Sequence, residues 1–128
     1  YNSEKNVFKL IDPRGIWGNT IGGDIKYDLA KIRHSIIGCF DTIRNGLYSI
    51  KYEGINEIEF NVFKPKNYEI ICDELDAHIR KKWNLDEIKL IEGLLFISML
   101  PLHGDNVERQ LAFFCIGLQR LNEIFGDD

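Results

Sequence analysis

The residues with the clearest chemical potential lie near the start of the chain, where Asp12 ends an apolar segment. It belongs to the stretch L-I-D-P-R-G over residues 10–15, and a segment with glycines at 18, 22 and 23 follows. A carboxylate at the end of a buried strand, next to such a loop, is well placed to hold Mg²⁺ on substrate phosphates. Aspartate also caps turns before proline, so a purely structural role for Asp12 stays open. Arg14 is a candidate for contacting a phosphate or an acidic substrate, and an ion pair with Asp24 is the alternative.

The elements around these residues can be predicted from turn signals and periodicity. Residues 1–23 contain a short strand at 7–11 and then the loop that carries Asp12. Asp24 is a good N-cap for a long helix over residues 24–46, and Gly46 is suited to the position just past its end. The apolar residues of this helix recur every three or four positions, which is typical of one buried face. They are Ile25, Leu29, Ile32, Ile36, Phe40 and Ile43.

The rest of the chain predicts a β-hairpin over residues 47–63 and a tail of three helices over residues 67–125. Asn67 and Asn84 are the candidate N-caps of the first two tail helices. The second is apolar on nearly every face from Ile88 onward, so we expect it to be the central buried helix. The last one starts at Asp105 or Asn106 and carries an apolar stripe from Val107 to Phe125. The prediction is a single domain over residues 1–128, mainly α with a small β component (α+β): one short strand, a hairpin and four helices.

Composition excludes several classes of function. The net charge of −4 and the predicted pI of 5.4 argue against a protein that binds nucleic acid by neutralising phosphates. The apolar run Leu94–Leu102 is too short to span a bilayer. Cys39, Cys72 and Cys115 lack metal-ligand spacing and lie in apolar helical segments, which favours reduced core thiols in a cytoplasmic protein.

The pattern I-D-P-R-G followed by G-D-x-x-Y-D-L-A-K resembles a segment of the aminoglycoside phosphotransferase and choline kinase group of protein-kinase-like enzymes. The resemblance covers residues 7–47 and is closest to members associated with bacterial surface polysaccharides. In that group, a catalytic loop of the form His-Gly-Asp-x-x-x-x-Asn precedes a strand ending in a metal-binding Asp. A helix that starts with Gly-Asp-Pro-x-x-Asp-Leu-Ala follows. The resemblance implies the helical C-terminal subdomain of a kinase-like fold.

The resemblance also implies roles for individual residues. Asp12 would be the ligand of Mg²⁺ bound to ATP, and Asp24 and Asp28 would cap the helix and tie it to the catalytic loop. Ile25 replaces the usual proline, which the first turn of a helix tolerates. The implied activity is phosphoryl transfer from ATP to a hydroxyl group of an amino sugar, a choline-like alcohol or a sugar.

The catalytic loop of that group should lie just before Tyr1, and it is absent, as is the ATP-binding lobe. We therefore expect a C-terminal fragment that is inactive alone and whose partner is a missing N-terminal lobe. The exposed edge of the strand at 7–11 could also pair two copies of the chain. The alternative is a non-catalytic interaction domain with a degenerate kinase-like fold.

Two histidines, His103 and His34, could suggest chemical roles, but structural positions are expected for both. His103-Gly104-Asp105 matches the start of a catalytic loop, but Gln110 stands where the loop needs asparagine, which favours a turn between helices with Asp105 as N-cap. His34 lies beside the apolar stripe of the first helix, so a core or boundary position is expected in preference to a ligand or general-base role.

Overall fold

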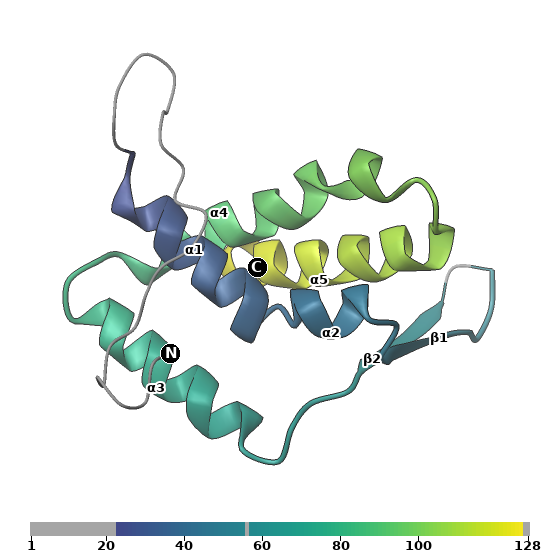
Figure 1. Cartoon of the computed structure of the whole chain (residues 1–128), viewed down its shortest axis with the longest axis horizontal. Helices are drawn as coiled ribbons and strands as arrows, with labels where there is room; N and C mark the ends of the chain where they lie inside the picture. The colour runs from purple at the N-terminus through teal and green to yellow at the C-terminus, as the bar shows by residue number, and fades with distance from the viewer. Residues whose placement is uncertain (1–22, 56, 127–128) are drawn as a thin grey trace, which may run out of the picture.

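The computed structural model describes residues 23–55 and 57–126, and in this part the chain forms a group of packed helices with a single antiparallel hairpin at one end (Figure 1). The elements are α1 (Ile25–Ile36), α2 (Phe40–Arg44), β1 (Tyr48–Tyr52), β2 (Ile58–Val62), α3 (Tyr68–Arg80), α4 (Leu85–Ser98), the 3₁₀ turn η1 (Leu100–His103) and α5 (Val107–Phe125). The predicted mainly α architecture with a small β component is confirmed. The predicted strand at 7–11 lies outside the described residues.

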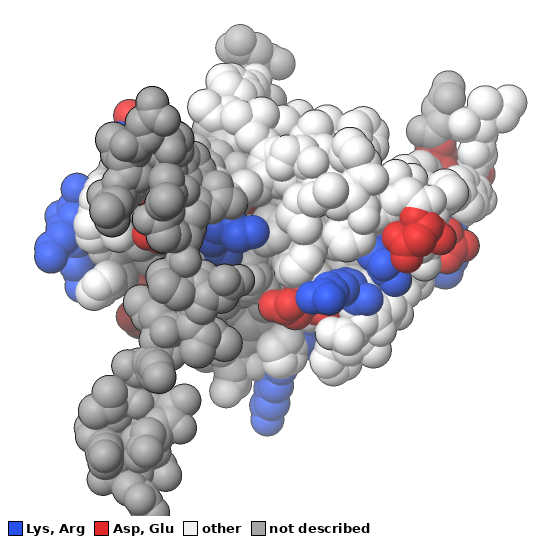
Figure 2. Space-filling model, turned by 45° about the horizontal axis from the view of Figure 1, so that its top comes forward, with Lys and Arg blue, Asp and Glu red and all other residues white. Residues whose placement is uncertain are grey.

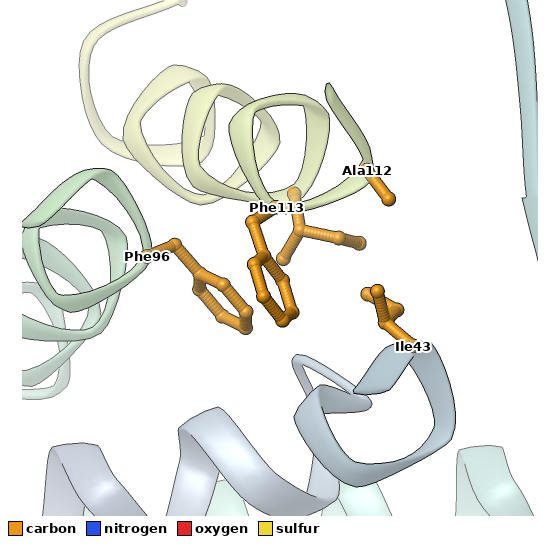
Figure 3. Packing of buried hydrophobic residues seen from close by; sticks show 5 residues of the cluster. Ile43, Phe96, Ala112 and Phe113 are labelled. Atoms are coloured by element: carbon orange, nitrogen blue, oxygen red, sulfur yellow. The ribbon is translucent and has the colours of Figure 1, made fainter. Parts of the chain in front are cut away.

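Helix α4 is the central element, as its sequence predicted. It packs against α1 on one side and α5 on the other, and α1 lies between α3 and α4 (Figure 1). One buried cluster joins α1, α3 and α4, and it consists of Ala30, Ile79, Leu85 and Ile88. A second joins α2, α4 and α5 (Figure 3), and it consists of Ile43, Phe96, Ala112, Phe113 and Ile116.

Glycines allow α4 and α5 to approach each other closely. A Cβ atom added at Gly93 would lie 2.9 Å from Cδ2 of Leu121, and one added at Gly117 would lie 2.8 Å from Cδ1 of Ile97. Both distances are shorter than a real van der Waals contact. The two helices therefore pack at a separation that larger residues at these positions would not permit.

The predicted long helix over residues 24–46 is wrong, because the chain breaks it into α1 and α2. Cys39 adopts the left-handed backbone conformation, with φ of 54°, between the two helices. At Gly38 the backbone passes directly against the ring of Phe96, where an added Cβ would lie 2.5 Å from two ring carbons. This break turns α2 toward α5, and Gly46, with φ of 75°, follows the end of α2.

Half of the apolar stripe predicted to form the buried face of the first helix is exposed. Ile25, Ile32 and Ile36 are 49%, 45% and 39% exposed, whereas Arg33 and His34 are buried. Leu29 and Phe40 are partly buried and Ile43 is fully buried. The same reversal occurs on α5, where Phe114 is exposed and its neighbours toward α4 are buried. The buried positions of α5 are Ala112, Phe113, Ile116 and Gly117. The buried faces therefore include residues that the predicted apolar stripes left out: Arg33 and His34 on α1, and Phe113 and Ile116 on α5.

The hairpin forms where the sequence predicted it. Its register pairs Tyr48 with Val62 and Ile50 with Phe60, and these four side chains pack against the cluster around Phe113. The hairpin therefore covers one end of the α2–α4–α5 core.

A broad uncharged surface lies on the α4 side of the molecule. Figure 2 turns this side toward the viewer and shows an area with almost no Lys, Arg, Asp or Glu. Residues 93–104 and 110–119, on α4, η1 and α5, include no charged side chain. None of the helices in the described part of the chain has both the length and the apolar character needed to cross a membrane.

Candidate functional site

The first turn of α1 carries the predicted site residues that the structure describes. The Asp24 carboxylate accepts a hydrogen bond from the backbone N–H of Lys26 at 2.9 Å, so Asp24 is the N-cap that the sequence predicted. Nζ of Lys26 lies 2.5 Å from Oε2 of Glu87, which joins this turn to the first turn of α4. The start of α1 is thus tied to the central helix.

Asp28 is exposed on the same turn. Because it follows Asp24 by four positions, the two carboxylates lie on one side of the helix. Asp12 and Arg14, the other predicted site residues, lie outside the described residues. The structure therefore places only the two carboxylates assigned to supporting the site.

A buried charge cluster holds α1 against α3 and α4. Nε of Arg33 donates a hydrogen bond to Oε2 of Glu92 at 2.7 Å, and neither side chain has any exposed surface. Nη1 of Arg33 pairs with the carboxylate of Asp76 on α3. Nε of Arg120 on α5 lies 3.8 Å from Oε1 of Glu92. Four helices therefore contribute to one set of charges.

Burial raises the pKa of Glu92, and the guanidinium groups of Arg33 and Arg120 oppose this rise. Arg33 stays charged because a guanidinium does not lose its proton in proteins. Nη1 of Arg120 also lies 2.5 Å from Oε1 of Glu123, so each arginine faces more than one carboxylate. The cluster holds the helices together, and its positive and negative charges largely compensate one another.

His34 lies in an aromatic environment next to this cluster. Its ring centroid is 4.1 Å from that of Phe96 and 4.6 Å from that of Phe40, and the residue is 1% exposed. Neither ring nitrogen has a hydrogen-bond partner among the described residues. Burial, together with the charge of Lys31, lowers the pKa of His34 to about 4. His34 is therefore a neutral core residue near neutral pH, which agrees with its predicted core or boundary position.

The segment His103-Gly104-Asp105 connects α4 to α5, so the predicted turn between helices is confirmed. The N-cap of α5 is Asn106, whose side chain accepts from the backbone N–H of Arg109 at 2.9 Å. Asp105, the predicted cap, instead pairs with the Arg109 side chain at 3.4 Å. Of the two residues predicted to start this helix, Asp105 and Asn106, the structure uses Asn106 as the cap, and both residue types make good caps.

The cysteines are free thiols, and Cys39 and Cys72 are buried on either side of Tyr68. Burial raises the pKa of both thiols, which keeps them protonated and weakly nucleophilic. Cys115 is half-buried, and burial raises its thiol pKa as well.

Sequence reasoning missed the pairing of Arg33 with Glu92, although each residue left a signal. Glu92 is the one charged residue in the apolar run from Leu90 to Leu102. A lone carboxylate in such a run indicates a buried partner of opposite charge. Arg33 follows Ala30 by three positions and precedes Ile37 by four, which places it on the face that those two buried residues define.

No family model, curated protein or solved structure matches this chain. The resemblance to kinase-like phosphotransferases therefore stays a prediction from the motif.

Proposed function

We propose that this chain is the helical, acceptor-side part of a cytoplasmic, ATP-dependent small-molecule phosphotransferase of the protein-kinase-like fold. The transferred phosphoryl group would pass to a hydroxyl of an amino sugar, a choline-like alcohol or a sugar. One observation supports this most strongly: Asp24 caps α1 within the G-D-x-x-Y-D-L-A motif, directly after the segment that carries Asp12. The resembled family has a helix start at the corresponding place.

The proposal gives separate roles to the carboxylates. Asp12 would hold Mg²⁺ against the phosphates of ATP, where the metal neutralises charge that develops on the transferred group. One carboxylate holds Mg²⁺ weakly, so ATP oxygens and a residue of the catalytic loop would complete the coordination. Asp24 and Asp28 would position the catalytic loop from the first turn of α1. The residue that orients the acceptor hydroxyl would belong to that loop, and the chain alone would be inactive.

The packing of α1 supports this arrangement, because phosphoryl transfer depends mainly on accurate positioning. Arg33 is paired with Glu92 and Asp76 in the interior, which fixes α1 to α4 and α3, and Lys26 adds a surface ion pair with Glu87 at the start of the helix. Asp24 and Asp28 therefore start from a helix whose position relative to α3 and α4 is fixed. The net charge of −4 favours a cationic acceptor such as an amino sugar or a choline-like alcohol.

The first test is to read the coding DNA upstream of the Tyr1 codon. We expect an in-frame His-x-Asp-x-x-x-x-Asn loop preceded by a β-rich lobe that carries a lysine. An in-frame start codon with no such loop would overturn the proposal and favour a non-catalytic interaction domain.

The second test is ATP-dependent phosphorylation by the full-length protein, with aminoglycosides, hexosamines, choline and simple sugars as acceptors. We expect activity with at least one acceptor. We expect Asp12→Asn to lose this activity, because a neutral amide binds Mg²⁺ more weakly than a carboxylate does. Asp41→Asn is the matched control, because Asp41 is an exposed carboxylate on α2. Equal activity of the two variants would contradict the role of Asp12.

A further inference from the structure

A hollow of about 260 Å³ opens where the end of α1, strand β2, the start of α3 and helix α5 meet. Its apolar lining includes Ile37, Val62 and Ile116. A second hollow of about 180 Å³ adjoins it, and the two share Ile37, Lys64, Tyr68 and Arg120 in their walls. Ligand sites in proteins commonly combine such an apolar lining with a few polar groups.

Four of the polar side chains that line the larger hollow carry N–H groups, and the Asn61 amide already donates one hydrogen bond to Oε1 of Glu59 at 2.8 Å. Lys64 and Arg120 are the charged residues among the described side chains that line it, and the amides of Asn61 and Gln119 line it as well. No carboxylate belongs to the described lining of this hollow. A ligand inside it would therefore meet positive charge and hydrogen-bond donors.

The carboxylates that balance these cations lie on the side of the smaller hollow. Nζ of Lys64 is 3.7 Å from Oε1 of Glu69, and Nη1 of Arg120 is 2.5 Å from Oε1 of Glu123. Glu69 and Glu123 line the smaller hollow only. Each cation thus pairs with a carboxylate of the smaller hollow, while the cation itself lines both hollows.

Arg120 has unused hydrogen-bonding capacity at this place. Its Nε is buried and has no hydrogen-bond partner among the described residues, because Oε1 of Glu92 at 3.8 Å is too far away. Nη2 of the fully buried Arg33, in the wall of the smaller hollow, also lacks a partner there. Oε1 of Glu92 also has no hydrogen-bond partner among the described residues, so Nε of Arg120 faces a carboxylate oxygen at a distance that leaves both atoms unpaired. Because an unpaired buried N–H donor costs free energy, an acceptor atom placed beside Arg120 would be stabilised.

The shared wall is preorganised. The hydroxyl of Tyr68 donates to the carbonyl oxygen of Ile37, which fixes the ring between the two hollows. The Lys64 ammonium lies 4.6 Å from the centre of that ring, a distance that favours a cation–π contact. The cation that a ligand would meet is therefore held in place before binding.

From these observations we infer that the larger hollow binds the phosphate or carboxylate group of a small molecule. Arg120 and Lys64 contact the anionic oxygens, Asn61 and Gln119 donate additional hydrogen bonds, and the apolar lining contacts the body of the ligand. The hollow is distinct from the proposed nucleotide site, because Ile37 and Asp24 flank opposite ends of α1, whose 12 residues extend about 18 Å. The inference does not depend on the proposed function.

The test is isothermal titration and amide NMR with three ligands that share one body: phenyl phosphate, benzoate and phenol. Each is titrated at constant ionic strength set with sodium chloride. We expect saturable binding of phenyl phosphate or benzoate, with shifts at the amides of Asn61, Lys64 and Gln119, and binding of phenol that is at least tenfold weaker. The stronger of the two anions identifies the oxyanion that the hollow prefers. Absence of saturable binding by both anions at millimolar concentrations would overturn the inference.

Variants locate the site. Lys64→Gln and Arg120→Gln should each weaken anion binding about tenfold, since each removes a charge-assisted hydrogen bond. Lys51→Gln is the matched control, because Lys51 is an exposed lysine on β1 that pairs with Glu59. Lys64 is in an exposed connecting segment, so its variant reports on binding even where loss of Arg120 disturbs folding. Equal affinities of Lys64→Gln and Lys51→Gln would place the anion elsewhere.

Discussion

Nε of Arg33 lies 2.7 Å from Oε2 of Glu92, and the two side chains are entirely removed from solvent. The pair crosses from α1 to α4, and Asp76 extends it to α3. Transfer of either charge from water is expensive, so each residue depends on the other for compensation. Removal of either side chain of this pair therefore leaves the other as a buried charge with less compensation, which destabilises the packing of the helices.

Glu92→Gln should lower the free energy of unfolding by about 3 kcal/mol, because Arg33 then keeps only one of its two carboxylate partners in a buried place. Urea denaturation followed by circular dichroism measures this. Glu87→Gln is the control, since Glu87 pairs with Lys26 at the surface and should matter little. Equal midpoints for the two variants would show that the buried pair is dispensable.

Stability should fall in mildly acidic solution because of His34. Its pKa in the folded protein is about 4, below the ordinary value of 6.5, so folding favours the neutral ring. The stability this residue contributes is complete above about pH 6.5 and is lost as the pH falls toward 4, by at most about 3 kcal/mol.

Urea midpoints measured across this pH range should show the loss in the natural chain and a shallower slope in His34→Phe. His78→Gln should keep the natural slope, because His78 is exposed. Parallel profiles for His34→Phe and the natural chain would assign the pH dependence to other groups.

Gly117→Ala should destabilise the protein by about 2 kcal/mol, because the new methyl group has no room. It would lie 2.8 Å from Cδ1 of Ile97 and 3.2 Å from Cβ of Phe96. Thermal unfolding measures the effect, with Gly104→Ala as a control whose nearest neighbour is 3.9 Å away. A Gly117→Ala protein as stable as the control would mean that α4 and α5 can separate without cost.

Tyr68→Phe should loosen the joint between α1 and α2. The lost hydroxyl leaves the carbonyl of Ile37 with only the weak thiol donor of Cys39 at 3.7 Å, at a cost of about 1 kcal/mol. Hydrogen exchange of the amides at 37–43 should accelerate more than exchange in α5. Tyr52→Phe is the control and should leave these exchange rates unchanged, because Tyr52 is 68% exposed. Unchanged exchange rates in Tyr68→Phe would show that its hydroxyl does not hold α1 and α2 together.

Local signals predicted much of the fold correctly. Asp24 and Asn84 cap their helices through their own side chains, and the hairpin follows from alternation on both sides of a turn. Asn67 occupies the predicted N-cap position of α3 but makes no capping hydrogen bond with its side chain. Helix caps and hairpins depend on a few neighbouring residues, so they can be predicted from the sequence without knowledge of the fold.

The errors arose where distant parts of the chain meet. The break at Cys39 comes directly after Gly38, whose backbone lies against the Phe96 ring, and no local pattern near Gly38 indicates that ring. The buried face of α1 was missed because Arg33 belongs to a residue type that usually faces solvent. For the candidate site, Asp24 could be predicted as a cap, whereas the charge cluster required knowledge of which helices touch.

The pairing of α1 with α4 also orders events during synthesis. Arg33 and Glu92 are separated by 59 positions, and α2, the hairpin and α3 emerge from the ribosome between them. α1 must therefore wait, with its guanidinium in water, until its partner helix has been translated, whereas α4 and α5 meet soon after each is made. The contact between Arg33 and Glu92 can therefore form only after most of the described chain has been made.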